Sequence, residues 1–553
     1  EISHMTMNGS QIIAEALKRQ GVDMFFFIMG GPMMATEDAC VAAGLRAIDV
    51  RHEQAGAMAA HAYARLRRRP GVCMSASGPA MTNLVTGVAH AFADGVPILA
   101  IGGAAPTVSQ GRGVFQEMDQ LSIMRPCTKW CERVHHPARI PELIDKAFRI
   151  AMSGKPGPVY LDLPGDILYQ DIDEETINWP EPWDPAKRPR AAAMPDKVEE
   201  IVELLEAAEN PVLLTGSGIL WSEAEEQLQA FVDKAGIPFY TTPQGRGVVP
   251  EDHPCCFPAA RSTAFREADL IAVVGTRLNY IVAHLAAPRF SGDATIARID
   301  IDVEEIAGSP RELDIGIVAD AKVALGQLNK AIAGTADPAR YEGWRGKLAD
   351  IEASKRAGPG SNSLSDAVPI HPLRLCEEVK NFMDRDAVLV VDGQEILNYG
   401  RQSMPTHTPG HRLNSGPFGT MGVGLPFGLG AKVAKPDNQV IVVHGDGSFG
   451  LNAMELDTAV RHNIPVLVVI SLNGGWTADP DQDKPGRNLG YVRYDKMAEG
   501  LGCYSEYVEE PGEIQAALER AQAEVDKGRV AVVNVKTDWA AQAVTQKFAT
   551  YST

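Results

Sequence analysis

The sequence has few features of a secreted, membrane-bound or nucleic-acid-binding protein. Its eight cysteines show no paired metal-ligand spacing and no signal peptide is visible, which favours reduced thiols and a cytoplasmic location. No apolar stretch approaches the roughly 20 residues that span a bilayer, so no membrane partner is expected. With 52 Lys and Arg against 71 Asp and Glu, the formal charge is −19, which argues against nucleic acid as a partner.

The length and composition predict a large α/β protein of several domains. At 553 residues the chain exceeds one ordinary core, so two to four domains are expected. An apolar content of 45% with 52 Gly and 37 Pro fits an α/β enzyme with many tight turns. Proline-rich or polar stretches at 179–195 and 334–369 indicate linkers between the domains.

Short apolar runs alternate with helical stretches, which is typical of doubly wound parallel sheets. The first helix is expected over 11–19, with Ser10 as its N-cap and Gly21 as its stop. We therefore predict an α/β fold of three doubly wound parallel-sheet domains, at 7–180, 195–335 and 368–553. The predicted strands of the first two domains are 24–28, 72–75, 98–101, 159–163, 212–215, 239–241, 270–274 and 297–301.

Asp446 and Asn473 form the most informative pair in the chain. Each follows an apolar run, at 440–443 and 466–470, and their separation of 27 positions leaves room for one turn, a helix and a return strand. The two strand ends should therefore lie side by side, one offering a carboxylate and the other an amide oxygen. This arrangement predicts Mg²⁺ holding a diphosphate at the carboxyl end of a parallel sheet.

The pattern resembles the thiamine diphosphate motif, and the resemblance extends over nearly the whole chain. The block 49–57 matches the family's catalytic block, with Glu53 at the position of the catalytic glutamate. The blocks 77–82 and 419–426 resemble the loop beside the aminopyrimidine ring and the segment that bends the cofactor. The resemblance implies thiamine diphosphate and Mg²⁺ as cofactors, bound between a pyrimidine and a diphosphate domain with a middle domain between them in sequence.

The resemblance also implies roles for individual residues. Glu53 would hydrogen-bond N1′ of the aminopyrimidine, and the Gly419 carbonyl would accept from the 4′-amino group. Because Glu53 and Asp446 lie in different domains, the family's architecture implies a homo-oligomer, a dimer usually doubled to a tetramer. The further cofactor and metal residues implied are Met421 between the two rings, Gly393, Gln394, Gly445, Gly447, Ser448 and Phe449 at the diphosphate, and Asp446, Asn473 and Gly475 at Mg²⁺.

Two blocks resemble oxalyl-CoA decarboxylases and 2-hydroxyacyl-CoA lyases. One is 115–120, followed by Arg125 and Pro126, and it adds Phe115 and Gln116 to the predicted catalytic set. The other is the middle-domain loop 275–280, which lies in a pocket for ADP or the adenosine end of CoA in those families. The residues implied at this pocket are Gly216, Ser217, Arg277, Asp300, Ile301 and Asp320.

The departures from these families narrow the prediction. Decarboxylases usually carry Tyr-Glu at 115–116, and a tyrosine where this chain has Trp476-Thr477, while 477–489 is unusually rich in Asp and Pro. These changes most resemble the actinobacterial 2-hydroxyisobutyryl-CoA lyase branch. We predict a lyase that cleaves a short or branched 2-hydroxyacyl-CoA, best 2-hydroxyisobutyryl-CoA, to formyl-CoA and a ketone such as acetone.

Three alternatives stay open. A carboligase like acetolactate synthase or benzaldehyde lyase fits because Phe-Gln at 115–116 also occurs there, and an oxalyl-CoA decarboxylase fits the CoA pocket. A degenerate, non-catalytic family member is the third, and intact Glu53, Asp446 and Asn473 count against it. Bound CoA or ADP would favour the lyase, and bound FAD the synthase.

Overall fold

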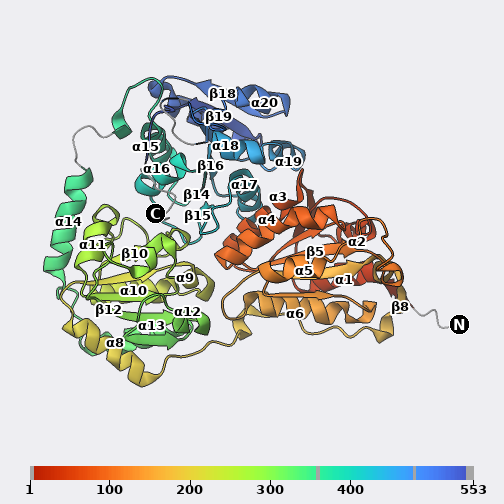
Figure 1. Cartoon of the computed structure of the whole chain (residues 1–553), viewed down its shortest axis with the longest axis horizontal. Coiled ribbons are helices and arrows are strands. Elements are labelled where there is room, and N and C mark those ends of the chain that lie inside the picture. Colours follow the sequence, from red (N-terminus) through yellow and green to blue (C-terminus); the bar gives the residue numbers. More distant parts are fainter. Residues whose placement is uncertain (1–4, 357–361, 477–480, 482, 544–553) are drawn as a thin grey trace.

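The computed structural model describes residues 5–356, 362–476, 481 and 483–543. It contains three parallel sheets, one in each of an N-terminal, a middle and a C-terminal domain. The N-terminal and middle domains stand side by side, and the C-terminal domain lies across the top of both (Figure 1). The predicted α/β fold with three doubly wound parallel-sheet domains is confirmed; the exact domain boundaries stay predictions.

The N-terminal domain is built on six parallel strands covered by helices on both faces (Figure 1). Its first helix begins two residues earlier than expected, because Asn8 and Gln11 form a capping box. The prediction of Ser10 as N-cap is wrong, since its hydroxyl bonds Thr36 and the Leu168 carbonyl instead. The strands, in sheet order, are β3 (Arg46–Asp49), β2 (Met24–Phe27), β4 (Gly71–Ser75), β5 (Ile98–Ala104), β7 (Val159–Pro164) and β6 (Trp130–Arg133). The helices are α1 (Gly9–Arg19), α2 (Met34–Ala42), α3 (Glu53–Arg67), α4 (Pro79–Asp94), α5 (Gln120–Met124), α6 (Ile140–Met152) and α7 (Gly165–Tyr169), and β1 (Thr6–Asn8) pairs with β8 (Asp171–Asp173).

The middle domain repeats the scheme with five parallel strands. Its core clusters consist of its own residues, so its apolar interior is separate from that of the other two domains. The strands, in sheet order, are β10 (Phe239–Thr241), β9 (Pro211–Thr215), β11 (Leu270–Val274), β12 (Thr295–Asp300) and β13 (Ile315–Val318). The helices are α8 (Pro195–Ala207), α9 (Ser217–Ser222), α10 (Glu225–Ala235), α11 (Arg261–Glu267), α12 (Val303–Ala307), α13 (Ala321–Ala331) and α14 (Glu342–Arg356).

The C-terminal domain has six parallel strands, and β16 and β17 are neighbours in its centre. The strands, in sheet order, are β15 (Arg412–Asn414), β14 (Val388–Asp392), β16 (Val440–Gly445), β17 (Leu467–Leu472), β19 (Ala531–Lys536) and β18 (Tyr504–Val508). The helices are α15 (Pro372–Phe382), α16 (Glu395–Ser403), α17 (Gly424–Ala434), α18 (Asp446–Leu451), α19 (Glu455–Arg461), α20 (Tyr494–Gly500) and α21 (Ile514–Asp526).

Helices α3 and α17 join the N-terminal and C-terminal domains into one core. A Cβ at Gly430 of α17 would clash with the Ala59 carbonyl of α3, so the two backbones touch directly. The buried apolar cluster around this seam takes its residues from these two domains, apart from Trp221 of the middle domain. Close backbone contact fixes the position of α3, which carries Glu53 at its N-terminus.

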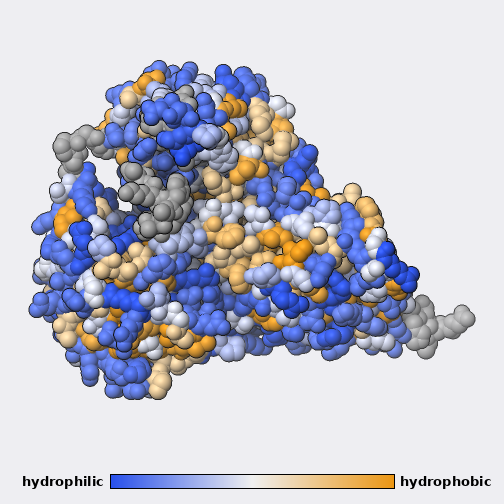
Figure 2. Space-filling view, viewed as in Figure 1, coloured by the Kyte–Doolittle hydropathy of each residue, from blue (hydrophilic) through white to orange (hydrophobic). Residues whose placement is uncertain are grey.

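Within the described ranges, no helix is both long and apolar enough to cross a bilayer. On the face shown in Figure 2, hydrophobic residues gather over α4 and α5 of the N-terminal domain. The loop between β5 and α5 is also apolar and exposed: 87% of Phe115 and 77% of Val108 are accessible. Such a surface is typical of a protein–protein contact.

Candidate active site

Asp446 lies where two neighbouring strand ends meet. It begins α18 directly after β16, and β16 pairs with β17 so that Gly445 lies beside Ser471. The Asp446 side chain is buried, and its two oxygens accept from the Gly447 N–H at 2.9 Å and the Gly474 N–H at 2.8 Å. The structure therefore places the carboxylate against the Asn473 turn, as the spacing predicts.

The electrostatics of Asp446 favour a bound cation. Burial raises the pKa of this carboxyl to about 7, although backbone N–H groups around it act in the opposite direction. Among the described residues no Lys or Arg forms an ion pair with it. A buried carboxylate without a cationic side chain, beside the amide oxygen of Asn473, matches the oxygen donor set that Mg²⁺ takes.

A small cavity of about 20 Å³ marks this site. Gly419 is the one predicted cofactor glycine that does not line it. Trp476 also lines the cavity, and its ring packs on Gly447, where an added Cβ would lie 2.7 Å from it. A diphosphate bound here would have to displace Trp476. The predicted residues that do line the cavity are Gly393, Gln394, Met421, Gly445, Asp446, Gly447, Ser448, Asn473 and Gly475.

Glu53 belongs to a second group of polar residues, in the N-terminal domain. It is 9% exposed, and its Oε2 accepts from Asn83 Nδ2 of α4 at 2.9 Å. Since His52 caps α3 and the α3–α17 seam fixes the helix, the carboxylate is held in one place. Asn83 escaped the sequence reasoning, because one asparagine in a helix has no distinguishing pattern.

The predicted loops 77–82 and 115–120 meet close to this group. Ser77 Oγ donates to Gln116 Oε1 at 2.9 Å, and Gln116 has a positive φ of 58°. The buried Gln120 accepts from the Gly78 N–H at 2.7 Å and donates to Asp162 Oδ1 at 2.6 Å. The Ser77 bond therefore fixes the Gln116 side chain against the 77–82 loop, and the Gln120 bonds fix the end of the 115–120 block.

Within the described part of one chain, the two groups do not share a cavity. Glu53, Phe115 and Gln116 are all absent from the lining of the Asp446 cavity. The predicted catalytic and metal residues therefore form two half-sites within a single copy of the chain.

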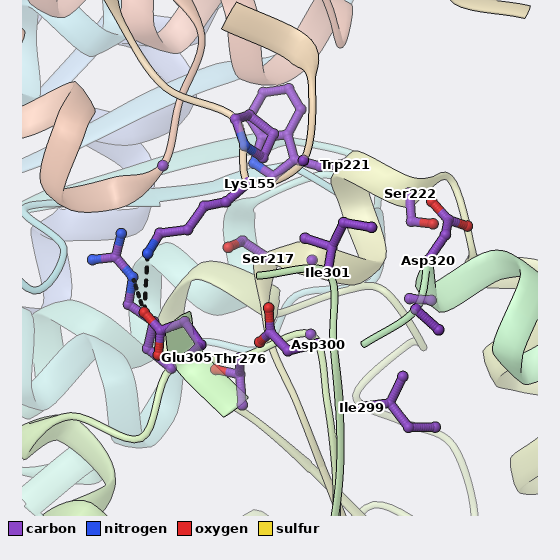
Figure 3. A pocket seen from close by; sticks show the side chains of 18 of the residues that line it. Lys155, Ser217, Trp221, Ser222, Thr276, Ile299, Asp300, Ile301, Glu305 and Asp320 are labelled. Atoms are coloured by element: carbon purple, nitrogen blue, oxygen red, sulfur yellow. Dashed lines mark hydrogen bonds and ion pairs between the residues drawn. The ribbon is translucent and has the colours of Figure 1, made fainter. Parts of the chain in front are cut away.

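The middle domain has a crevice of about 100 Å³ at the carboxyl ends of its strands, where α/β folds bind ligands. In Figure 3, Ser217 and Asp300 approach it from the ends of different strands, and Lys155 pairs with Glu305. Five predicted residues line it, whereas Gly216 does not and instead packs against Thr276. Those five are Ser217, Arg277, Asp300, Ile301 and Asp320.

Two of these charged side chains already have partners. Arg277 Nη1 donates to the Ala93 carbonyl of α4 at 2.6 Å and its Nε lies 3.4 Å from Glu305. Asp320 caps α13 and pairs with Arg190 at 2.9 Å. Asp300 is paired as well, since it accepts from the Asp302 N–H at 3.0 Å and lies 3.6 Å from Arg298 Nη2. Burial nevertheless raises its pKa to about 6.

Comparison with known proteins now identifies the family. Three models match in succession: the N-terminal TPP binding domain of thiamine pyrophosphate enzymes at residues 7–123, their central domain at 198–328, and their C-terminal TPP binding domain at 397–535. The chain belongs to the thiamine pyrophosphate enzyme family. Thiamine pyrophosphate is thiamine diphosphate, so the resemblance found in the sequence is confirmed at the level of the family and of the cofactor.

Similar thiamine pyrophosphate enzymes carry different activities. A probable acetolactate synthase of Mycobacterium bovis is 33% identical over 544 residues, covering 96% of each chain. A 2-hydroxyacyl-CoA lyase of Oryza sativa subsp. japonica is 34% identical over 560 residues, covering 97% of this chain and 96% of that one. Human 2-hydroxyacyl-CoA lyase 1 is 32% identical over 552 residues, covering 95% and 94%. Overall similarity therefore does not separate lyase from synthase in this thiamine pyrophosphate enzyme.

Proposed function

We propose that this protein is a thiamine diphosphate-dependent 2-hydroxyacyl-CoA lyase. The best candidate reaction cleaves 2-hydroxyisobutyryl-CoA to acetone and formyl-CoA. The observation that carries the choice of a CoA ester is a basic cavity, separate from the middle-domain crevice, between the middle and C-terminal domains.

The basic cavity has a volume of about 670 Å³, within the range typical of ligand pockets. Its lining includes six basic and two acidic residues. Burial, together with Arg289, Arg401 and Arg246, lowers the pKa of Arg261 to about 10. Three of the basic side chains are paired with acids: Arg246 with Glu251, Arg356 with Glu352 and Lys380 with Glu377. Arg261, Lys355 and Arg401 have no ion-pair partner among the described residues, and this unbalanced positive charge favours a polyanionic ligand. The charged residues of the lining are Arg246, Arg261, Lys355, Arg356, Lys380, Arg401, Glu251 and Glu377.

The diphosphate and 3′-phosphate of CoA supply such a polyanion, whereas pyruvate, the substrate of an acetolactate synthase, carries one carboxylate and no tail. Helix α16 links the cavity proposed for the cofactor's diphosphate to the basic cavity proposed for the CoA phosphates. Gln394 and Glu395 at its start line the Asp446 cavity, and Arg401 near its end lines the basic cavity. Seven residues of helix span about 10 Å, a gap that an extended pantetheine arm can bridge.

The residues of the two half-sites would then act as follows. Thiamine diphosphate supplies a carbanion at C2 of its thiazolium ring. Glu53, oriented by Asn83, would hold a proton at N1′ of the aminopyrimidine. Asp446, Asn473 and the Gly475 carbonyl would hold Mg²⁺ against the diphosphate.

Three further predicted residues have proposed places around the same cofactor. Gln116 and the exposed Phe115 would face the acyl group and keep water away from it. The Gly419 carbonyl would accept from the 4′-amino group.

We further propose that two copies of the chain complete each site. Two half-sites in separate places and the exposed apolar loop around Phe115 support a homodimer, which can pair again as a tetramer. The middle-domain crevice would bind a separate adenine nucleotide, either ADP or the adenosine end of a second CoA, with Asp300 accepting from a ribose hydroxyl.

The decisive assay compares three substrates with one enzyme preparation loaded with thiamine diphosphate and Mg²⁺. The lyase predicts formyl-CoA and acetone from 2-hydroxyisobutyryl-CoA, with little turnover of pyruvate or oxalyl-CoA. Efficient pyruvate turnover without formyl-CoA from any 2-hydroxyacyl-CoA would overturn the proposal in favour of a carboligase. Release of CO₂ from oxalyl-CoA would identify a decarboxylase instead, and chromatography of the nucleotide released by denaturation would separate ADP or CoA from FAD.

A further inference from the structure

A second group of metal-ligating side chains lies outside the site described so far. His61 of α3 and His90 and Asp94 of α4 are all buried, and their ligand atoms lie within 4.8 Å of one another. The group sits where the three domains meet. Phe427 of the C-terminal domain packs on both imidazoles, and Gln244 of the middle domain donates to Asp94 Oδ2 at 3.0 Å.

The contacts within the group are not those of a hydrogen-bonded network. His90 Nε2 lies 3.2 Å from Asp94 Oδ2, and His61 Nε2 lies 3.5 Å from the same oxygen. Nevertheless both ring nitrogens of His90, His61 Nδ1 and Asp94 Oδ1 are buried without a hydrogen-bond partner. Unsatisfied polar atoms in such number are rare in folded proteins, and each calls for a compensating partner.

The spacing fits a tetrahedral metal ion. Bonds of about 2.0–2.1 Å to nitrogen and oxygen place neighbouring tetrahedral ligands about 3.3 Å apart, close to the two observed separations. Two imidazoles and a carboxylate suit Zn²⁺, whereas Mg²⁺ prefers oxygen ligands alone.

The surroundings of His61 keep this ligand in its metal-binding form. Burial, His90 and the Arg65 guanidinium all lower the pKa of His61, so this imidazole is neutral and able to bind a metal. Arg65 is a basic side chain beside the group, and its Nη2 donates to the Gln244 carbonyl. Asp94 supplies the opposing charge.

We propose that His61, His90 and Asp94 bind one Zn²⁺ ion. The ion would tie α3 and α4 together at the junction of the domains, with a water molecule or a rotated Gln244 amide as its fourth ligand. Because His61 lies eight residues along α3 from Glu53, the ion would be structural and separate from the Mg²⁺ at Asp446. The proposal is independent of the substrate.

The test measures zinc in the whole protein, purified without a histidine tag from zinc-supplemented cells and dialysed in buffer containing Mg²⁺. Mass spectrometry of the metal should find about one zinc per chain. His90→Asn should lower the stoichiometry and weaken zinc binding at least tenfold, on the order of the loss when a metal site is disturbed. The matched control replaces His135 and His136, two exposed histidines adjacent in sequence, by Ala, and it should change neither the zinc content nor the zinc affinity. Wild-type protein without zinc, or an equal loss in the control, would overturn the proposal.

Two further measurements cover a variant that fails to fold. X-ray absorption at the zinc edge of the wild-type protein should show nitrogen and oxygen neighbours at about 2.0–2.1 Å. Sulfur at about 2.3 Å would place the zinc on cysteines and refute the site. In His90→Asn protein that folds, titration with thiamine diphosphate and Mg²⁺ should match the wild type, and a parallel loss would mean that zinc had been measured at Asp446.

Discussion

Mixing two inactive variants should restore activity, because each copy of the chain holds only one intact half-site. Glu53→Gln removes the acid that serves the aminopyrimidine, and the new amide can still accept from Asn83, so the fold should persist. The expected loss is about 10²–10⁴-fold, the contribution of general acid–base catalysis. Asp446→Asn keeps the size of the side chain but removes the charge that holds Mg²⁺, so this variant should also be inactive.

The recovered activity follows from the proposed symmetry. A mixed dimer combines the intact Glu53 of one copy with the intact Asp446 of the other at one site, while its second site carries both defects. Statistical exchange makes half of the dimers mixed, and half of their sites are intact, so the mixture should reach about a quarter of the wild-type rate. A tetramer built from such dimers gives the same fraction.

The assay mixes the purified variants, dissociates them in mild denaturant, dilutes them into cofactor and follows formyl-CoA. Each variant taken alone through the same steps is the control for recovery without exchange. Sedimentation measures whether mixed species form. Mixed dimers without activity would show that both half-sites serve a single chain, and the reasoning from the separate cavities would be refuted.

Three further results are expected. Arg261→Ala should raise KM for the CoA ester about ten- to a hundredfold, the value of one charge-assisted contact. The control Arg266→Ala, on the exposed side of the same helix, should leave KM unchanged. Equal KM values for the two variants in steady-state assays would exclude the basic cavity as the CoA site. Since the pKa of Asp446 is raised to about 7, a proton competes with Mg²⁺ at lower pH, and calorimetry should show affinity falling below pH 7 by up to about tenfold per unit. Mg²⁺ affinity that does not vary with pH would contradict the assignment of Asp446 as a ligand. The same carboxyl also contributes to the folding stability of the apoprotein below its unfolded pKa, and this contribution is lost as the pH rises through 7. Trp476→Phe should abolish the fluorescence change on addition of cofactor and Mg²⁺, while Trp344→Phe should retain it; a full signal without Trp476 would show that the ring does not move.

The sequence predicted the fold class because buried strands stand out as short apolar runs. All eight named runs correspond to strands in the structure. The strands that were not predicted are mostly at sheet edges, where one side of the strand lacks a neighbour and fewer side chains are buried. The edge strand β13 alternates buried and exposed residues, and β18 is largely half-buried.

The candidate site was partly predictable for the same reason. Asp446 and Asn473 each follow a buried strand directly, so their meeting could be derived from spacing. The basic cavity could not, because Arg261 and Arg401 are 140 positions apart on different domains and neither lies in a motif. The N-cap of the first helix was also missed, since Asn8 and Ser10 both have capping side chains and tertiary contacts decide between them.

The backbone contact between α3 and α17 has a consequence for how the molecule comes apart. Because the N-terminal and C-terminal domains share one apolar interior, they should melt as a single cooperative unit, while the middle domain, with an interior of its own, can melt separately. The middle-domain crevice and the basic cavity both lie on the border of that separate body. A ligand in either one would bridge the two units, and the thermal transitions of the protein would then merge as the ligand concentration rises.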